Sequence, residues 1–228
     1  MDIFADLGFT AVVLTSAGIY AVFALGLQLQ VGHAGLVNFG HVGYLAIGAY
    51  TVAVANERGH GVIASTLLAM LVALIASLVI GIVTLRLRED FLAITSIAAS
   101  SLIYLFILNN SELTGGPRGI DAGTEFRTTV TRPLLRWARD NGWDIDRALP
   151  LLVIVWIAVA LTWAFLMLLV RSPWGRMMRA VREDENAVRA LGRNPFLYRL
   201  QALIIGAQIG ALAGVLYGFN LVFITPES

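Results

Sequence analysis

The chain has 228 residues, of which 58% are hydrophobic and 14% charged, and its mean hydropathy is +0.78. Soluble domains carry about a quarter charged residues, so this composition excludes an ordinary soluble domain and indicates a bilayer protein. All 16 basic residues are Arg, which excludes a phosphate-loop or Schiff-base Lys and assigns any ATP hydrolysis to another polypeptide, and the absence of Cys excludes disulfides and thiolate metal sites.

The apolar segments predict six membrane spans. Residues 1–10 contain two Asp and no basic residue, so they lack the positive region of a cleavable signal peptide, and we expect the first span to stay in the mature protein. Residues 7–56 then run for 50 residues without a charge, which at about 1.5 Å per residue is enough for two helices that each cross roughly 30 Å. Four further uncharged runs are each long enough to cross once: residues 59–85, 91–111, 148–170 and 200–226. Because these runs are far longer than the strands of an outer-membrane barrel, the predicted fold class is an all-α integral membrane protein.

A polar, glycine-rich break interrupts the first long apolar stretch. Residues 31–43 contain four Gly, two His and one Asn at bilayer depth, where non-helical backbone is tolerated only if protein or a water-filled cavity covers it. One interpretation is an element of a translocation path, and its candidate residues are Gly32, His33, Gly35, Asn38, Phe39, Gly40, His41 and Gly43. The alternative is that Gly35, Gly40 and Gly43 allow close helix packing while the two His lie at the interface near water. The His pair does not suggest a metal site, because eight residues separate its members and no carboxylate or thiolate is near.

Two linkers differ in character from the spans. Residues 86–90 predict a tight charged turn, and residues 109–149 carry six Arg and six acids, as expected for a structured extramembrane loop. Within that loop, residues 133–139 predict a short interfacial helix with Pro in its first turn, although an ordinary solvated loop is the alternative.

The most basic segment, residues 171–199, holds seven Arg and three acids. Ser172 followed by Pro173 predicts a helix start, and Gly192 predicts a stop. Between them, four apolar side chains recur on one helical face: Trp174, Met177, Met178 and Val181. An amphipathic pair of short helices fits this pattern. It could rest on anionic lipid, but the acidic residues 183–185 favour a surface that docks on another protein.

Other chemistry is missing from the sequence. No nucleophile and base stand at a catalytic spacing, no charged residue lies inside a predicted span, and the net charge of +1 does not suggest a nucleic-acid partner. We therefore expect no enzyme activity and no cofactor. An ion-coupled secondary transporter is disfavoured, but Na⁺ coupling through backbone carbonyls would leave no such trace. A scaffold or sensor would have no use for the polar break.

Three motifs in order resemble a known family: residues 26–41 running into 47–51, residues 113–120, and residues 171–176 continuing through 182–185 to 190–192. Over essentially the whole chain, the sequence is similar to the membrane subunits of branched-chain amino acid ABC importers, in particular the second of the two paired permeases, the LivM type.

The resemblance implies a role for each motif. Residues 172–192 would be the cytoplasmic coupling loop that sits in a cleft of the ATPase subunit, with the coupling residues Arg182, Glu183, Asp184, Glu185, Ala187, Ala190, Leu191 and Gly192. Residues 32–43 would line the path between the paired permeases. The outer segment would face a substrate-binding protein through Thr114, Gly115, Gly116 and Pro117.

The resemblance also implies partners and orientation. The partners would be a LivH-type second permease, cytoplasmic ATP-binding subunits, an extracytoplasmic substrate-binding protein and membrane lipids, in the plasma (inner) membrane of a prokaryote. The single membrane domain, residues 1–228, would place residues 171–199 inside and 109–149 outside, and by parity the N-terminus outside. Arg counts of nine on the inner side and seven on the outer agree by a slim margin.

Two departures from the family leave alternatives open. Members usually continue into further spans after residues 225–228, so we expect a C-terminally truncated or partial chain. Residues 95–101 lack the acidic residue that relatives often carry in the fourth span, so importers of urea or short amides, which share much of the scaffold, remain alternatives to branched-chain or similar amino acids.

Overall fold

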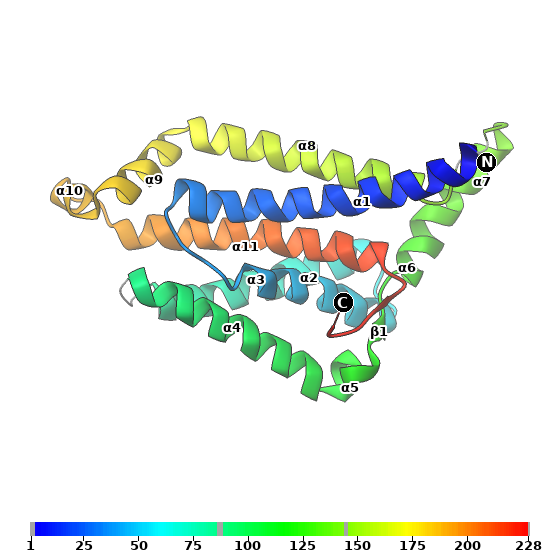
Figure 1. Cartoon of the computed structure of the whole chain (residues 1–228), viewed down its shortest axis with the longest axis horizontal. Coiled ribbons are helices and arrows are strands. Elements are labelled where there is room, and N and C mark those ends of the chain that lie inside the picture. The colour runs from blue at the N-terminus through cyan, green and yellow to red at the C-terminus, as the bar shows by residue number, and fades with distance from the viewer. Residues whose placement is uncertain (1–2, 86–88, 144–145, 228) are drawn as a thin grey trace.

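The computed structural model describes residues 3–85, 89–143 and 146–227, and long helices lying side by side dominate it (Figure 1). The six longest are α1 (Ile3–Leu27), α2 (His41–Glu57), α3 (Val62–Thr84), α4 (Glu89–Asn109), α8 (Leu149–Arg171) and α11 (Pro195–Asn220). These segments are apolar, and in hydrocarbon a helix satisfies all of its backbone hydrogen bonds within the segment. The predicted all-α membrane fold is confirmed.

Within the described part of the chain, five helical stretches rather than six are long and apolar enough to cross a membrane: Gly8–His33, Val62–Thr84, Phe91–Asn109, Leu149–Arg171 and Pro195–Asn220. The missing one is α2, whose 17 residues span only about 26 Å at 1.5 Å per residue. The reason is the polar break, because residues 34–40 connect α1 to α2 without helical structure that would extend either one.

Helix α11 is the central element of the bundle. In its most apolar window 72% of the residues are buried, against 33% or less in the other four stretches. Helix α2 crosses it in backbone contact: a Cβ added to Gly48 would lie 2.1 Å from the carbonyl oxygen of Ala211, and one added to Gly214 would lie 2.0 Å from that of Leu45. Small residues therefore let the two helices approach more closely than larger side chains would permit.

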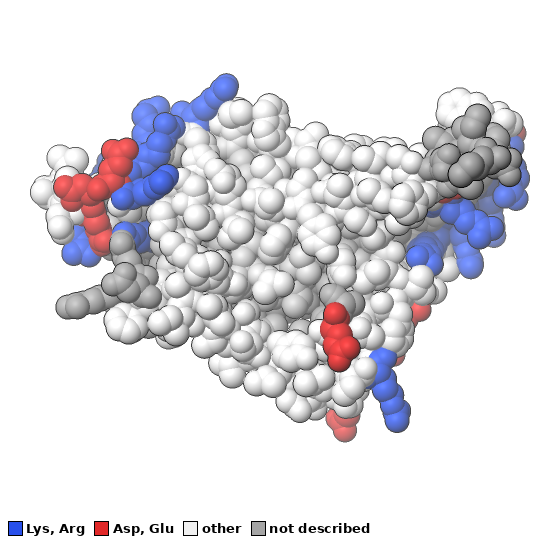
Figure 2. All heavy atoms as spheres, in the orientation of Figure 1, with Lys and Arg blue, Asp and Glu red and all other residues white. Residues whose placement is uncertain are grey.

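The outer helices present apolar side chains outward. Helix α3 exposes a continuous series of large aliphatic residues, among them Ile63, Leu67, Leu71, Ile75 and Val79. Figure 2 shows the same pattern on the face in view, where charged side chains gather at the two ends and a broad uncharged band lies between them. This distribution fits a bundle whose middle lies in hydrocarbon.

Short elements cover one end of the bundle. They are α5 (Ser111–Thr114), η2 (Gly116–Arg118), β1 (Ile120–Asp121), α6 (Thr124–Phe126), η3 (Arg127–Thr131) and α7 (Arg132–Asp140). After α11, β2 (Phe223–Ile224) pairs antiparallel with β1, with Ile120 opposite Ile224. The structured loop and its short helix are confirmed, because Pro133 stands in the first turn of α7. Whether α7 lies at the membrane interface stays a prediction.

The opposite end carries α9 (Pro173–Glu183) and α10 (Glu185–Ala190). In Figure 1 these helices lie far from α7, which is near the start of α1. The structure thus separates residues 171–199 from residues 109–149 along the bundle axis, as the alternation of spans requires. Of the predicted charged turn, residues 86–88 lie outside the described residues, and α4 begins at Glu89.

Candidate functional site: the polar break and the coupling segment

The polar break starts with a change of helix type. Helix α1 passes into a π-helical segment, η1 (Gln28–His33), and the chain then runs without helical structure until α2 begins at His41. Gly35 adopts a φ of +69°, a left-handed conformation that a side chain would strain. The predicted interruption of the helix is confirmed.

A buried chain of hydrogen bonds closes the break against α11. The Nε2 of Gln30 donates to the carbonyl oxygen of Leu203 at 3.0 Å, and the Nδ2 of Asn38 donates to the Oε1 of Gln30 at 2.9 Å. The backbone N–H of Gly40 then donates to the Oδ1 of Asn38 at 3.0 Å. These side chains supply partners for backbone groups that lack a helix at this depth.

Helix α4 packs on the other side of the break. The backbone N–H of Phe39 donates to the Oγ of Ser96 at 3.1 Å, and a Cβ on Gly40 would lie 2.1 Å from the Ser96 carbonyl oxygen. One turn on, a Cβ on Gly43 would lie 2.9 Å from the Cδ1 of Ile103. Close packing is therefore what Gly40 and Gly43 provide, as one of the two interpretations expected.

The two histidines lie in different surroundings. His41 is only 2% exposed, its ring centroid lies 4.7 Å from that of Phe23 with the ring planes tilted by 40°, and it fits between Gly26 and Gly210. The expectation that both His lie near water is thus wrong for His41, because glycines on α1 and α11 leave a buried space for its ring. His33 is partly exposed, with its Nδ1 3.3 Å from the Gln28 carbonyl oxygen. No group of three potential metal ligands occurs among the residues described.

The eight candidate path residues share one segment but not one environment. Asn38, Gly40, His41 and Gly43 are buried, Gly32 and His33 are partly exposed, and Gly35 and Phe39 are exposed. The side chain of Phe39 is 63% exposed, so it is the largest side chain that the set offers to a partner or to lipid. A path-lining role stays a prediction. Sequence reasoning gave Gln30 no role, since its partner Leu203 is 173 positions away.

The coupling segment, residues 172–192, forms the predicted pair of helices. The Oγ of Ser172 accepts a hydrogen bond from the N–H of Gly175 at the start of α9, and Met178 and Val181 are buried. Gly192, with a φ of +73°, follows the end of α10. Both boundary predictions are confirmed because they rest on local capping rules.

Two of the three acids in the coupling segment have structural roles. Asp184 caps α10, with its Oδ1 accepting from the N–H groups of Asn186 and Ala187 at 2.9 and 3.0 Å. Glu185 forms ion pairs with Arg189 and, at 2.9 Å, with Arg199 of α11. Glu183 is the exposed acid with neither role in the part of the chain that is described, and docking by the acidic cluster stays a prediction.

The tip of the coupling segment exposes an aliphatic side chain among charged ones. Leu191 is 78% exposed, and Ala187 and Ala190 are exposed beside it on α10. On the other helix, Trp174 donates from its Nε1 to the Oε1 of Gln201 at 2.8 Å, which fixes α9 against α11. The segment thus presents small and aliphatic side chains outward beside exposed charged ones such as Glu183 and Arg189.

Arg182 connects the coupling segment to the polar break. Its Nη1 donates to the carbonyl oxygen of Gly32, and its Cγ lies 2.9 Å from where a Cβ on Gly35 would be. A larger residue at Gly35 would meet both the Arg182 side chain and an unfavourable φ. The two candidate sites are therefore in direct contact, which no local sequence pattern indicated.

Residues 114–117, the predicted binding-protein surface, form a turn. Thr114 is buried and donates from its Oγ1 to the Ile107 carbonyl oxygen at 2.6 Å, and a Cβ on Gly115 would lie 2.0 Å from the carbonyl oxygen of Gly119. Gly116 is also buried, so Pro117 is the exposed member of the predicted binding-protein surface. Contact with a binding protein stays a prediction.

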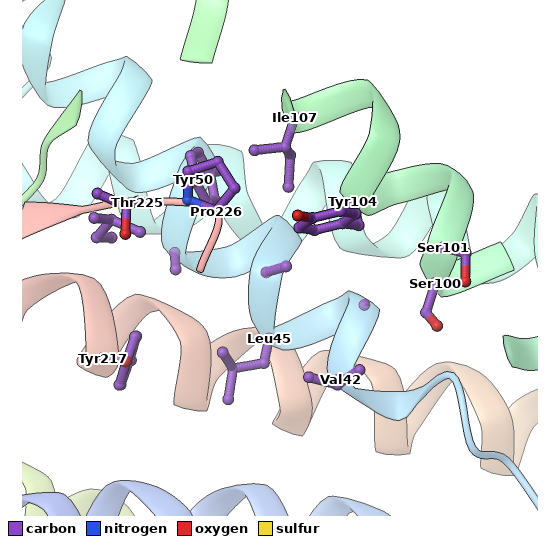
Figure 3. A pocket seen from close by; sticks show the side chains of 14 residues that line it. Val42, Leu45, Tyr50, Ser100, Ser101, Tyr104, Ile107, Tyr217, Thr225 and Pro226 are labelled. Carbon is purple, nitrogen blue, oxygen red and sulfur yellow. The ribbon is translucent and has the colours of Figure 1, made fainter. Parts of the chain in front are cut away.

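A cavity of about 280 Å³ lies near this end of the bundle, between α2, α4 and the end of α11 (Figure 3). It was not anticipated from the sequence, because its walls come from three separate parts of the chain. Two of its residues, Val42 and Gly43, belong to the start of α2 immediately after the break.

The chain is similar in sequence to several known permeases. The LivM permease of Escherichia coli strain K12, named as part of a high-affinity branched-chain amino acid transport system, is 36% identical over an alignment of 238 positions, which covers 96% of this chain and 54% of the relative. The probable LivM permease of Methanocaldococcus jannaschii is 29% identical over 257 aligned positions, which cover 96% of this chain and 69% of the relative. The LivH permease of Salmonella typhimurium is 26% identical over 216 aligned positions, which cover 90% of this chain and 68% of the relative.

The chain spans about half the length of the two bacterial LivM relatives that it matches at 36% identity. No solved structure matches it significantly. The family model of the branched-chain amino acid transport system permease component matches residues 9–228. Because that match covers nearly all of the sequence, the chain belongs to the family of branched-chain amino acid transport permease components.

Proposed function

We propose that the chain is a membrane-spanning permease subunit of an ABC importer for branched-chain or similar amino acids, driven by a separate ATPase subunit. The observation that carries the proposal is the coupling segment, a pair of short helices at one end of the bundle that exposes Leu191 at its tip and contacts the polar break through Arg182. Three further observations support the same function: the absence of Lys from the sequence, the helices long enough to span a membrane, and the names of the LivM relatives. The chain would act in transport rather than as an enzyme.

The coupling segment would dock in a cleft of a cytoplasmic ATP-binding subunit. Leu191 provides an aliphatic anchor, and burying one such side chain contributes about 1.5–3 kcal/mol. Exposed Glu183 lies at the end of α9, where it would meet a basic group of the partner. Arg182 would then carry movement of the docked helices to the backbone of residues 32–35.

Further partners follow from the family. The chain matches LivH permeases as well as LivM permeases, which supports pairing with a LivH-type second subunit across the polar break. An extracytoplasmic binding protein would deliver the substrate at the end that carries residues 109–149, and lipid would contact the apolar faces. The assembly would lie in the plasma (inner) membrane of a prokaryote, with residues 171–199 in the cytoplasm.

Docking is tested by changing the exposed tip. Leu191→Asp, in the permease coexpressed with its ATP-binding subunit, should lower copurification of that subunit about tenfold, because the aliphatic anchor is lost and a charge is buried. Glu183→Lys should also lower copurification of the ATP-binding subunit. Asn141→Asp is the matched control, since it adds one acid at an exposed position on the opposite end. Copurification that stays at the control level in both variants would contradict the docking role.

A further inference from the structure

We propose that the cavity between α2 and α4 is the site where the permease receives the side chain of an aliphatic amino acid without net charge. This inference rests on the proposed transport function and adds a substrate site to it. The argument uses the walls of the cavity, their chemistry, their volume and their continuity with the polar break.

The cavity has walls from three parts of the chain. Helix α2 contributes Val42, Gly43, Leu45, Ala46, Ala49 and Tyr50, and α4 contributes Ser100, Ser101, Tyr104 and Ile107. Tyr217 of α11 and residues 224–226 complete it. Figure 3 shows Tyr104 and Ile107 reaching from α4 toward α2. The pairing of β1 with β2 holds Ile224 in place at the outer end.

The chemistry of the lining is mixed and uncharged. Aliphatic groups alternate with hydroxyls of Tyr, Ser and Thr, and no lining residue among those described is ionised at neutral pH. A solute with net charge would lose hydration there without gaining a counter-ion, which disfavours basic and acidic amino acids. An aliphatic side chain gains by burial, while the hydroxyls can serve the polar end of the molecule.

Tyr50 supplies a specific polar anchor. It is only 7% exposed, and its hydroxyl has no hydrogen-bond partner among the described residues. Buried polar groups in folded proteins are nearly always paired, so an unpaired, buried hydroxyl beside a cavity is a group with which a polar ligand could form a hydrogen bond. The ammonium or carboxylate group of an amino acid can fill either role, because a phenol both donates and accepts.

Volume and position agree with a small transported solute. Pockets for drug-sized ligands measure about 300–1,000 Å³, and this cavity of about 280 Å³ falls just below that range. Val42 and Gly43 belong both to its wall and to the segment that follows the break. A solute in the cavity therefore lies beside the proposed path and at the end of the bundle that faces the binding protein.

The proposal is tested by uptake of radiolabelled leucine and alanine into membrane vesicles that contain the complete importer. Ala46→Leu fills the cavity with three carbon atoms and should lower the leucine-to-alanine uptake ratio about tenfold, since the space left accepts only the smaller side chain. Tyr50→Phe keeps the shape but removes the hydroxyl, and it should lower uptake of both amino acids about fivefold. Ala64→Leu, an exposed position on the apolar face of α3, is the control for the added volume.

The outcomes separate the two proposals. A wild-type importer that takes up no aliphatic amino acid, or only a short amide such as urea, overturns the transport function proposed above. If wild type takes up leucine but Ala46→Leu keeps the ratio of the Ala64→Leu control, and Tyr50→Phe transports normally, the cavity is not the substrate site. That second result is expected if a lipid acyl chain occupies it. All uptake rates are normalised to the amount of permease in the vesicles. If Ala46→Leu does not insert into the membrane, the uptake measured for Tyr50→Phe decides whether the cavity is the substrate site.

Discussion

Replacing Asn38 with Leu should destabilise the fold, because Asn38 is the middle link of the buried hydrogen-bond chain. The change removes the donor to the Oε1 of Gln30 and the acceptor for the N–H of Gly40, so two buried polar groups lose their partners. Each unsatisfied group costs about 1–3 kcal/mol, which gives a loss of about 2–6 kcal/mol for Asn38→Leu. For a chain of this size, about 2 kcal/mol corresponds to a midpoint shift of at least about 4 °C.

The assay is thermal unfolding of the purified permease in detergent, followed by loss of the monodisperse peak in size-exclusion chromatography. Phe39→Leu is the matched control: the side chain is exposed, and the hydrogen bond from its backbone N–H to Ser96 is kept. We expect the control to melt within about 1 °C of wild type. If Asn38→Leu also melts within about 1 °C of wild type, the chain of hydrogen bonds does not stabilise the break, and the prediction is wrong.

Two further predictions concern coupling and orientation. Arg182→Ala removes the hydrogen bond to the carbonyl oxygen of Gly32, and such bonds to charged groups contribute about 1.5–3 kcal/mol. We therefore expect amino acid uptake per ATP hydrolysed to fall about tenfold while ATPase activity persists. An unchanged ratio of uptake to ATP hydrolysis would show that this contact does not couple the two. The chain has no native Cys, so single Cys residues can be placed at exposed Asn141 and Asn186, which lie at opposite ends of the bundle. A membrane-impermeant thiol reagent applied to intact cells should label the first and spare the second, and the reverse pattern would invert the orientation and remove the ATPase docking site.

The features that depend only on neighbouring residues, such as the ends of helices, were predicted correctly from the sequence. Ser172 and Gly192 mark the ends of the coupling helices because a cap and a positive φ depend on neighbouring residues alone. The position of the polar break was also predicted from the sequence, because Gly, His and Asn are unusual at bilayer depth. By contrast, the bond from Gln30 to Leu203 joins distant parts of the chain, and no periodicity reveals which helices will meet.

The structure adds detail to two expectations. The uncharged run of residues 7–56 predicts two helices, and the structure has α1 and α2 there, but residues 34–40 form the break and α2 has only 17 residues. The acidic residues 183–185 predict a docking surface, which stays a prediction, and the structure shows that Asp184 also caps α10 and that Glu185 also pairs with Arg189 and Arg199. Composition gives the charge of such a cluster, whereas only geometry shows which of its charges are already used inside the protein.

The attachment of the coupling segment to α11 bears on where a movement imposed by a partner would enter the bundle. Glu185 pairs with Arg199, and Trp174 bonds to Gln201, so α9 and α10 are fastened at two points to the first turns of the same helix. That helix is the most buried one and is in backbone contact with α2 at Gly48. If a partner moves the short helices, that movement would reach the most buried of the long helices first and, through its backbone contact, α2.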